Sequence, residues 1–257
     1  MKNISQITQR PQFILTDIDD TLTDEGKLKP NAYQALWDLK NAGFKIIPIT
    51  GRPAGWCEMI ARFWPVDGIV GENGAFYFRY HQNKMHRYFE LPESVRLENQ
   101  KKLKVIEAEI LNQVPGCAVA SDQFSRLADL AIDFCEDVPA LSKDQVQKIK
   151  SIFEKHGAVA KISSIHVNGW FGNYDKLSMI KKMLHQEFQV SDNDLLKSCL
   201  FVGDSPNDEP LFSYFPQSVG VANVNQFLHQ MHFHPQFTTT GHGGDGFSEL
   251  SQHLLNL

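Results

Sequence analysis

The sequence predicts an α/β protein with a Rossmann-like, doubly wound parallel sheet and an inserted α/β cap domain. Short apolar runs alternate with amphipathic segments in the first 71 residues, and the same alternation returns near the C-terminus. Between them lies a block with its own α/β pattern. With 257 residues, 42% of them hydrophobic, the chain can bury the core that this architecture needs.

The N-terminal part supplies the first strands and helices. Phe13–Thr16 is a short apolar run bounded by polar residues, as expected of a buried parallel strand. Pro30–Asn41 has apolar residues at helical spacing, and Gly43 follows as a stop. Phe44–Ile49 is again strand-like, so the pattern predicts a strand–helix–strand unit.

The next helix and strand extend this unit. We expect a helix over Ala54–Phe63 and a third parallel strand over Gly68–Gly71. Right-handed crossovers would place the carboxyl ends of all three strands on one edge of the sheet. Ligands bind at that edge in open α/β sheets.

The middle of the chain predicts a separate domain. We expect residues 83–164 to form an α/β cap domain, and residues 1–82 and 165–257 to form the core. After the insertion, the core pattern resumes with a helix over 176–188 and strands over 199–202 and 218–222. The elements expected within the insertion are helices over 98–111 and 143–156 and strands over 128–134 and 158–167.

Clustered carboxylates follow the first strand directly. Asp17 and Asp19 stand at positions i and i+2, and Asp20 comes next. Such a cluster at the end of an apolar strand is costly without a counter-charge, which a divalent cation would supply. Oxygen ligands without a nearby Cys/His set indicate Mg²⁺ rather than zinc. The alternative is an Asx-rich turn that caps the next element.

Three further groups stand at strand ends or helix starts. Thr50 and Gly51 offer a hydroxyl and free amides to a phosphate oxygen. Lys176 opens a helix and can neutralise phosphate as a point charge. Asp204 and Asp208 follow another apolar strand. Each group alone is a weak signal, but together and in this order they indicate phosphate chemistry.

These motifs resemble those of the haloacid dehalogenase-like hydrolase superfamily, in particular the subfamily IIB (Cof-type and sucrose-phosphatase-like) phosphatases with a large α/β cap. Asp17-Ile18-Asp19-Asp20-Thr21 matches the first motif, with Asp20 where Gly is commoner. Thr50 matches the second, Lys176 the third, and Gly203-Asp204 with Asn207-Asp208 the fourth. The Asp20 departure leaves both acids in place but affects the turn, since Gly tolerates positive φ more easily.

The resemblance implies a mechanism. Asp17 would attack phosphorus to form an aspartyl-phosphate, and Asp19 would protonate the leaving oxygen and later activate water. Thr50 and Lys176 would hold the phosphoryl oxygens. The resemblance also implies an Mg²⁺ ion held by Asp17, the Asp19 carbonyl, Asp204 and, directly or through water, Asp208.

Substrate choice is expected to lie with the cap and the rim of the site. For Arg126 the alternative is a surface salt bridge, and for His166 and Asn168 an exposed strand face. The four histidines His229, His232, His234 and His242 are expected on the surface, and Gly241–Gly246 in a loop. The candidate substrate-binding residues are Thr50, Gly51, Arg52, Asn73, Arg126, His166, Asn168, Lys176 and Asn207.

Composition excludes several other classes. The formal net charge of −5 and the lack of a long basic run argue against nucleic acid as a partner. The four cysteines show no metal or redox spacing, and we expect buried, reduced thiols. No signal peptide or apolar run of membrane-spanning length is present, so we expect a cytoplasmic protein.

The most consistent hypothesis is therefore a Mg²⁺-dependent phosphatase acting on a small phosphorylated metabolite, with a sugar phosphate as the favoured type. A phosphomutase of the phosphomannomutase type shares the same first step, and the motifs do not separate the two. A binding module without catalysis is a third class. Retention of Asp17, Asp19, Lys176, Asp204 and Asp208 together argues against it.

Overall fold

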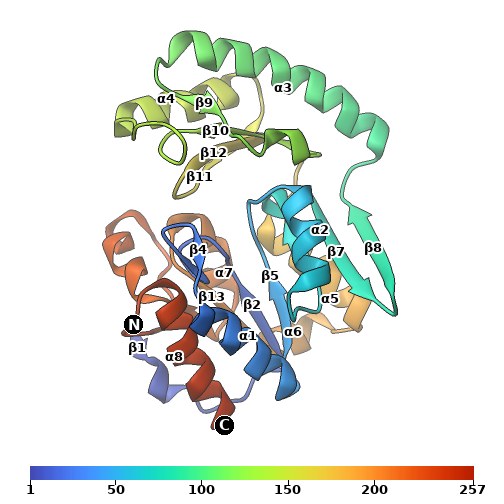
Figure 1. Cartoon of the computed structure of the whole chain (residues 1–257), viewed down its shortest axis with the longest axis vertical. Helices are drawn as coiled ribbons and strands as arrows, with labels where there is room; N and C mark the ends of the chain where they lie inside the picture. The colour runs from blue at the N-terminus through green and yellow to red at the C-terminus, as the bar shows by residue number, and fades with distance from the viewer.

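A six-stranded parallel sheet forms the centre of the protein. The computed structural model describes all 257 residues, and Figure 1 shows this sheet in the lower half of the molecule. The order is β1-β15-β14-β13-β2-β5, which is the crossover order of a doubly wound sheet. The strands are β1 (Lys2–Asn3), β2 (Phe13–Thr16), β5 (Lys45–Pro48), β13 (Cys199–Gly203), β14 (Ser218–Gly220) and β15 (Phe237–Thr238).

Helices cover both faces of this sheet. Along β2, Ile14 packs into one hydrophobic cluster, whereas Phe13 and Leu15 pack into another on the opposite face. This alternation buries the strand on both sides and confirms the predicted doubly wound core. The first face carries α1 (Pro30–Asn41), α2 (Ala54–Phe63) and α8 (Gly243–Leu255); the second carries α5 (Lys176–Phe188), α6 (Asp192–Ser198) and α7 (Glu209–Tyr214).

The predicted third parallel strand instead begins an antiparallel sheet. β6 (Ile69–Gly71) pairs with β7 (Phe76–His81), and β7 pairs with β8 (Lys84–Phe89). β6 joins the central sheet only through a parallel bridge between Ile49 and Val70. The chain reverses at residues 72–74, whose φ values of 43°, 55° and 106° are all left-handed. The β7–β8 hairpin was not predicted.

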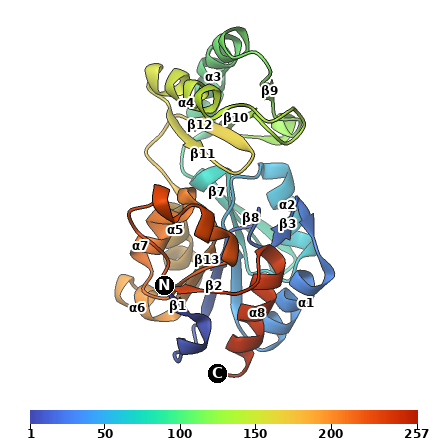
Figure 2. The same ribbon diagram turned by 90° about the vertical axis from the view of Figure 1, so that its left-hand side faces the viewer.

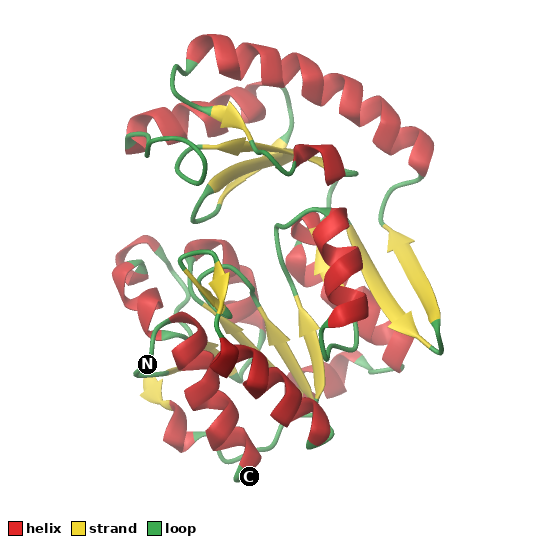
Figure 3. Ribbon diagram, in the orientation of Figure 1, coloured by secondary structure: helices red, strands yellow, loops and turns green.

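A second layered unit, here called the cap unit, lies above the core (Figures 1 and 2). Its antiparallel sheet has the order β11-β12-β10-β9 and is covered by two helices on the side away from the core, as the red ribbons in Figure 3 show. The elements are α3 (Glu93–Gln113), β9 (Ala118–Val119), β10 (Asp129–Asp133), α4 (Lys143–Lys155), β11 (Val159–Ile162) and β12 (His166–Trp170).

Two sequence expectations for this unit need correction. The single strand expected over 158–167 is two strands, because the chain turns back at 163–165 and β11 pairs antiparallel with β12. β12 was expected in the core, but it pairs along its full length with β10, from Asp133 opposite His166 to Asp129 opposite Trp170. From this pairing we propose that the inserted domain spans about residues 93–170.

Three further expectations concern a loop, the cysteines and membrane spans. The loop expected over 241–246 is confirmed only for its first two residues, because α8 begins at Gly243. All four cysteines are free, and two of them, Cys57 and Cys199, are buried. No helix combines the length and apolar character that a membrane crossing requires. A small hairpin is formed by β3 (Thr23–Asp24) and β4 (Lys27–Leu28), and 3-10 turns occupy Ile4–Gln6, Glu72–Gly74, Gln123–Ser125, Pro206–Asp208, Ala222–Gln226 and Leu228–Gln230.

Candidate active site

Asp17 lies at the carboxyl end of β2, where the central sheet faces the cap unit. Its backbone N–H donates to the carbonyl of Val202 on β13 (3.0 Å), which fixes it between two central strands. The side chain is buried, and Lys176 Nζ donates to its Oδ1 at 2.7 Å. The same ammonium donates to Asp208 Oδ1 at 2.9 Å. The first, third and fourth predicted motifs therefore meet at one point.

Three buried carboxylates, those of Asp17, Asp204 and Asp208, have oxygen atoms within 4.8 Å of one another. The backbone N–H of Asp204 donates to Asp208 Oδ2 (3.2 Å). Gly203 allows this approach, because a Cβ at that position would lie 2.4 Å from Asp208 Oδ2. The end of β13 is therefore shaped around the Asp208 carboxylate.

The carboxylates of this cluster are buried and repel one another, which disfavours their charged forms. Burial raises the pKa of Asp17 to about 8, with the charges of Asp208 and Asp19 adding to the shift and Lys176 opposing it. Burial and the charges of Asp208, Asp17 and Asp20 raise the pKa of Asp204 well above its ordinary value. One lysine cannot neutralise three buried carboxylates. A divalent cation that prefers oxygen ligands would supply the missing positive charge. The donor set therefore fits Mg²⁺.

Arg52 holds the Asp19 carboxylate. Nε of Arg52 donates to both Asp19 oxygens, at 3.0 and 3.1 Å, and Nη2 donates to Oδ1 at 2.9 Å. Arg52 Nη2 also donates to Glu136 of the cap unit at 3.0 Å. A buried guanidinium thus joins the expected acid/base residue in the core to a carboxylate of the cap unit.

Asp20 adopts the left-handed conformation that Gly would adopt more easily. Its φ is 58°, and its carbonyl accepts a hydrogen bond from Asn223 Nδ2 at 2.7 Å. Its N–H donates to Thr23 Oγ1 at 3.1 Å. Both bonds hold the turn, so this departure from the commoner residue is accommodated without moving Asp17 or Asp19 from the site.

Thr50 and Gly51 lie at the end of β5 and contact Asn73. The Thr50 hydroxyl accepts a hydrogen bond from the Arg52 N–H (3.0 Å), and its carbonyl accepts one from the Asn73 N–H (3.1 Å). A Cβ on Gly51 would lie 3.3 Å from the Asn73 side-chain amide. Asn73 Nδ2 is buried and has no hydrogen-bond partner. It is therefore a donor available near the phosphate-binding residues.

Arg126 is not the surface salt bridge that one sequence alternative described. Its side chain is fully buried and pairs with Asp122 (3.1 Å) and Asp129 (3.0 Å). Arg126 Nη1 also donates to the Gly51 carbonyl in the core at 2.9 Å. Asn168 is buried as well, and its Nδ2 donates to Asp129 Oδ2 at 3.0 Å. Asp129 therefore holds two of the expected cap residues, Arg126 and Asn168, in place.

His166 is buried rather than on an exposed strand face, and its Nε2 lies 2.9 Å from Glu136 Oε2. The His166 imidazole and the Arg52 guanidinium hold the pKa of Glu136 at about 2. The buried Asp133 side chain positions this glutamate, because its oxygens accept the N–H groups of Cys135 (2.9 Å), Glu136 and Asp137 (both 2.8 Å). The turn is an Asx motif.

Glu72 fastens the cap unit to the core, a role that sequence reasoning did not find. Its carboxylate is fully buried and accepts the N–H of Ala54, the first residue of α2, at 3.0 Å. It also accepts the N–H groups of Leu127 (2.9 Å), Ala128 (2.6 Å) and Asp129 (3.1 Å), at the start of β10. One side chain thus satisfies backbone donors in both units.

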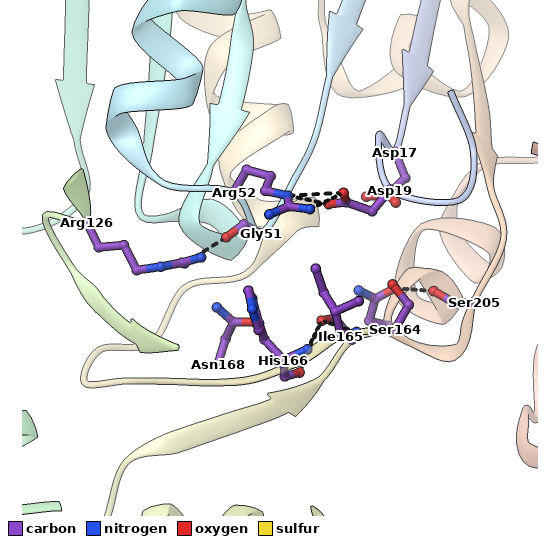
Figure 4. Close-up of a pocket in the computed structure, with 12 residues that line it drawn as sticks. Asp17, Asp19, Gly51, Arg52, Arg126, Ser164, Ile165, His166, Asn168 and Ser205 are labelled. Atoms are coloured by element: carbon purple, nitrogen blue, oxygen red, sulfur yellow. Dashed lines mark hydrogen bonds and ion pairs between the residues drawn. The ribbon is translucent and has the colours of Figure 1, made fainter. Parts of the chain in front are cut away.

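A cavity of about 20 Å³ lies between the core and the cap unit (Figure 4). The turn between β11 and β12 closes it opposite Asp17 and Asp19. The other expected site residues, Thr50, Asn73, Lys176, Asp204 and Asp208, are not among its lining residues. Glu136 is not among them either, but it contacts two of them, Arg52 and His166. The lining residues are Asp17, Asp19, Gly51, Arg52, Arg126, Ser163, Ser164, Ile165, His166, Asn168, Ser205 and Asn207.

Several of these residues were missed from the sequence. Ser163, Ser164 and Ile165 form the β11–β12 turn, and the polar Ser-Ser pair inside the expected strand was the signal that could have found it. Ser205 donates to Asn207 Oδ1 at 2.8 Å and so orients the expected residue. Glu136 follows a predicted strand end, as Asp17 does.

Known proteins resemble this chain over most of its length. A family model described as haloacid dehalogenase-like hydrolase matches residues 14–113. A phosphoglycolate phosphatase from Methanobrevibacter smithii is 23% identical over 248 residues, covering 94% of this chain and 97% of that protein. A crystal structure of a Thermoplasma acidophilum protein superposes with a TM-score of 0.73 at 16% identity, covering 97% of this chain and all of the other.

A sugar-handling structure also shares the fold. Sucrose-phosphatase from Synechocystis, solved with sucrose and phosphate, gives a TM-score of 0.64 at 14% identity, covering 96% of this chain and 98% of the other. Residues 14–113 therefore resemble the haloacid dehalogenase-like hydrolases in sequence, and the whole chain shares its fold with these solved structures.

Proposed function

We propose that this protein is a Mg²⁺-dependent phosphatase that hydrolyses a small phosphorylated metabolite, with a sugar phosphate as the substrate type, through an aspartyl-phosphate on Asp17. The observation that carries the proposal is the Asp17 carboxylate itself. It ends a central strand, faces the cavity, and is held on one oxygen by Lys176 at 2.7 Å. A nucleophile fixed in this way loses little freedom when it attacks.

The first step is the attack of Asp17 on phosphorus. A bond forms between a carboxylate oxygen and phosphorus while the bond to the leaving oxygen breaks, and Asp19 gives that oxygen a proton. Lys176 and Thr50, with the free amide of Asn73, supply donors for the phosphoryl oxygens. Bound Mg²⁺, held by Asp17, the Asp19 carbonyl, Asp204 and Asp208, would offset the repulsion between carboxylate and phosphate.

In the second step, Asp19 takes a proton from a water molecule that attacks the phosphorus of the aspartyl-phosphate. The bond between phosphorus and the Asp17 oxygen breaks as the water oxygen bonds to phosphorus, which releases inorganic phosphate, restores the Asp17 carboxylate and leaves Asp19 protonated for the next cycle. Arg52 keeps Asp19 in place through three donated hydrogen bonds, and it reaches the cap unit at the same time. Positioning of the acid/base group is therefore coupled to the cap unit.

The test is phosphate release from a panel of phosphorylated metabolites with Mg²⁺ present, run beside the Asp17→Asn variant. Release by the wild type and none by the variant supports the proposal. If no compound of the panel and no aryl phosphate is hydrolysed, the proposal is wrong. A phosphomutase would convert a sugar phosphate to its isomer without net phosphate release, and product analysis of the same reactions identifies that outcome.

A further inference from the structure

We infer that Glu136 is a specificity-determining residue that selects substrates with an uncharged, hydroxyl-bearing leaving group and rejects those whose leaving group carries a carboxylate or a second phosphate. This inference rests on the proposed function and names the substrate class more narrowly. It stands on the pairing of the charged side chains where the core meets the cap unit; Figure 4 shows two of them, Arg52 and Arg126, in the lining of the cavity.

The cationic side chains that line the cavity are already paired with carboxylates. Arg52 pairs with Asp19 at 2.9 Å and with Glu136 at 3.0 Å. Arg126 pairs with two carboxylates, Asp122 and Asp129. The only other lining residue that can carry positive charge is His166, which lies against Glu136. An incoming anion would find no cationic side chain without a carboxylate partner.

Carboxylates outnumber guanidinium groups there. Arg52 and Arg126 face Asp19, Asp122, Asp129 and Glu136 in this pairing. Both arginine side chains are 5% exposed or less, so water screens these charges weakly. A leaving-group carboxylate placed in this surrounding would have to break an existing pair and leave a buried carboxylate unpaired, which is strongly unfavourable.

A hydroxyl group meets the opposite situation. Glu136 is the most exposed carboxylate of the set, with 30% of its side chain accessible, and a carboxylate can accept several hydrogen bonds. Arg52 donates a hydrogen bond to its Oε1, and His166 Nε2 lies 2.9 Å from its Oε2, so the carboxylate is held in orientation while lone pairs remain. The neighbouring lining residues Ser163, Ser164 and Asn207 add uncharged donors and acceptors.

The inferred substrate preference differs from the substrate for which the relative named above is known. Phosphoglycolate has a carboxylate on its leaving group, and the Methanobrevibacter smithii protein is named for that substrate. At 23% identity the pocket need not be shared. We expect this protein to hydrolyse phosphoglycolate poorly compared with uncharged polyol phosphates.

The experiment compares matched substrates that differ in charge. The pairs are glucose 6-phosphate with 6-phosphogluconate and glycerol 3-phosphate with 3-phosphoglycerate. In the wild type, kcat/KM for the uncharged leaving group should exceed that for the anionic one by roughly tenfold or more in both pairs. Glu136→Gln should reduce this ratio at least fivefold, mainly by improving the anionic substrates. Glu109→Gln, on the outer helices of the cap unit, should leave it unchanged.

The outcomes are distinguishable. Hydrolysis of both members of each pair at equal kcat/KM, or a preference for the anionic member, overturns the inference while the proposed phosphatase function stands. So does an unchanged ratio in Glu136→Gln. If even an aryl phosphate is not hydrolysed, the proposed function fails instead. Should Glu136→Gln not fold, the wild-type ratios still decide the matter, because they need no variant.

Discussion

Lys176 and Asp17, 159 residues apart in the sequence, form a 2.7 Å ion pair inside the protein. Both side chains are buried, and charge attraction from Asp17 and Asp208 outweighs burial to raise the pKa of Lys176. The lysine thus remains charged at neutral pH. It fixes Oδ1 of Asp17, and the other oxygen of that carboxylate is left for reaction.

Asp17→Asn should abolish turnover while leaving the fold intact. The amide keeps the shape of the side chain but removes the nucleophilic charge, so we expect kcat to fall by about four orders of magnitude or more. Circular dichroism and thermal unfolding provide the control for folding. Activity within roughly tenfold of wild type would show that Asp17 is not the nucleophile.

Activity should require Mg²⁺, with Ca²⁺ a poor substitute. The three carboxylates of the cluster offer oxygen ligands within 4.8 Å, a compact set suited to a small octahedral ion. Ca²⁺ takes more ligands at longer distances and would displace the attacking carboxylate. Phosphate release is measured after chelation and after return of each ion. Full activity in chelator, or with Ca²⁺ alone, contradicts this expectation.

Gly203→Ala should displace the Asp208 carboxylate from the acidic cluster. The added Cβ would lie 2.4 Å from Asp208 Oδ2, and that carboxylate is held by Lys176 and cannot move freely. We expect a loss of about 1–3 kcal/mol in the free energy of unfolding. We also expect roughly a hundredfold lower kcat, because the acidic cluster is displaced. Urea unfolding and steady-state kinetics measure the two effects, and a variant equal to wild type in both would refute the argument.

Glu72→Ala should loosen the attachment of the cap unit. Four backbone N–H groups, among them the buried ones of Ala54 and Ala128, would lose their acceptor, and we expect a loss of about 3 kcal/mol in the free energy of unfolding. Glu98→Ala is the matched control, since its salt bridge with Lys102 is exposed and should change stability by less than about 0.5 kcal/mol. Equal unfolding free energies for the two variants would show that Glu72 holds nothing together.

The ion pairs of Glu136 should stabilise the protein above acidic pH. Its pKa is lowered from 4.5 to about 2 by His166 and Arg52, so the ionised form is favoured in the folded state. Its contribution should be complete above about pH 4.5 and lost as the pH falls toward 2. Unfolding free energies of wild type and Glu136→Gln, measured from pH 3 to 7, should converge toward acid. A constant difference over this range would contradict the expectation.

The central fold and the positions of the core motifs could be predicted from the sequence because they are local signals. The helix over Pro30–Asn41 and the strand over Phe13–Thr16 have the predicted bounds, and each motif stands next to such an element. The sheet then brings strand ends together by topology alone. The chemical roles assigned to Asp17 and the other site residues remain predictions.

The rest depends on long-range contacts that no local pattern encodes. Arg126 pairs with Asp122 and Asp129 close to it in the sequence, but its contact with the Gly51 carbonyl, 75 residues away, forms only when the cap unit meets the core. The reversal at Glu72 uses left-handed residues that need not be glycine, which made it hard to foresee. The two strands β11 and β12 both contain apolar residues, so their periodicity did not separate them.

A 20 Å³ cavity holds at most about one water molecule, and a phosphorylated sugar is many times larger. We therefore expect Arg52 to part from Glu136, and Arg126 to release the Gly51 carbonyl, when such a substrate enters and its product leaves. Added salt weakens charge pairs as soon as water reaches them. Moderate ionic strength should thus hasten product release, and where release limits kcat, the enzyme should turn over faster in salt than in dilute buffer.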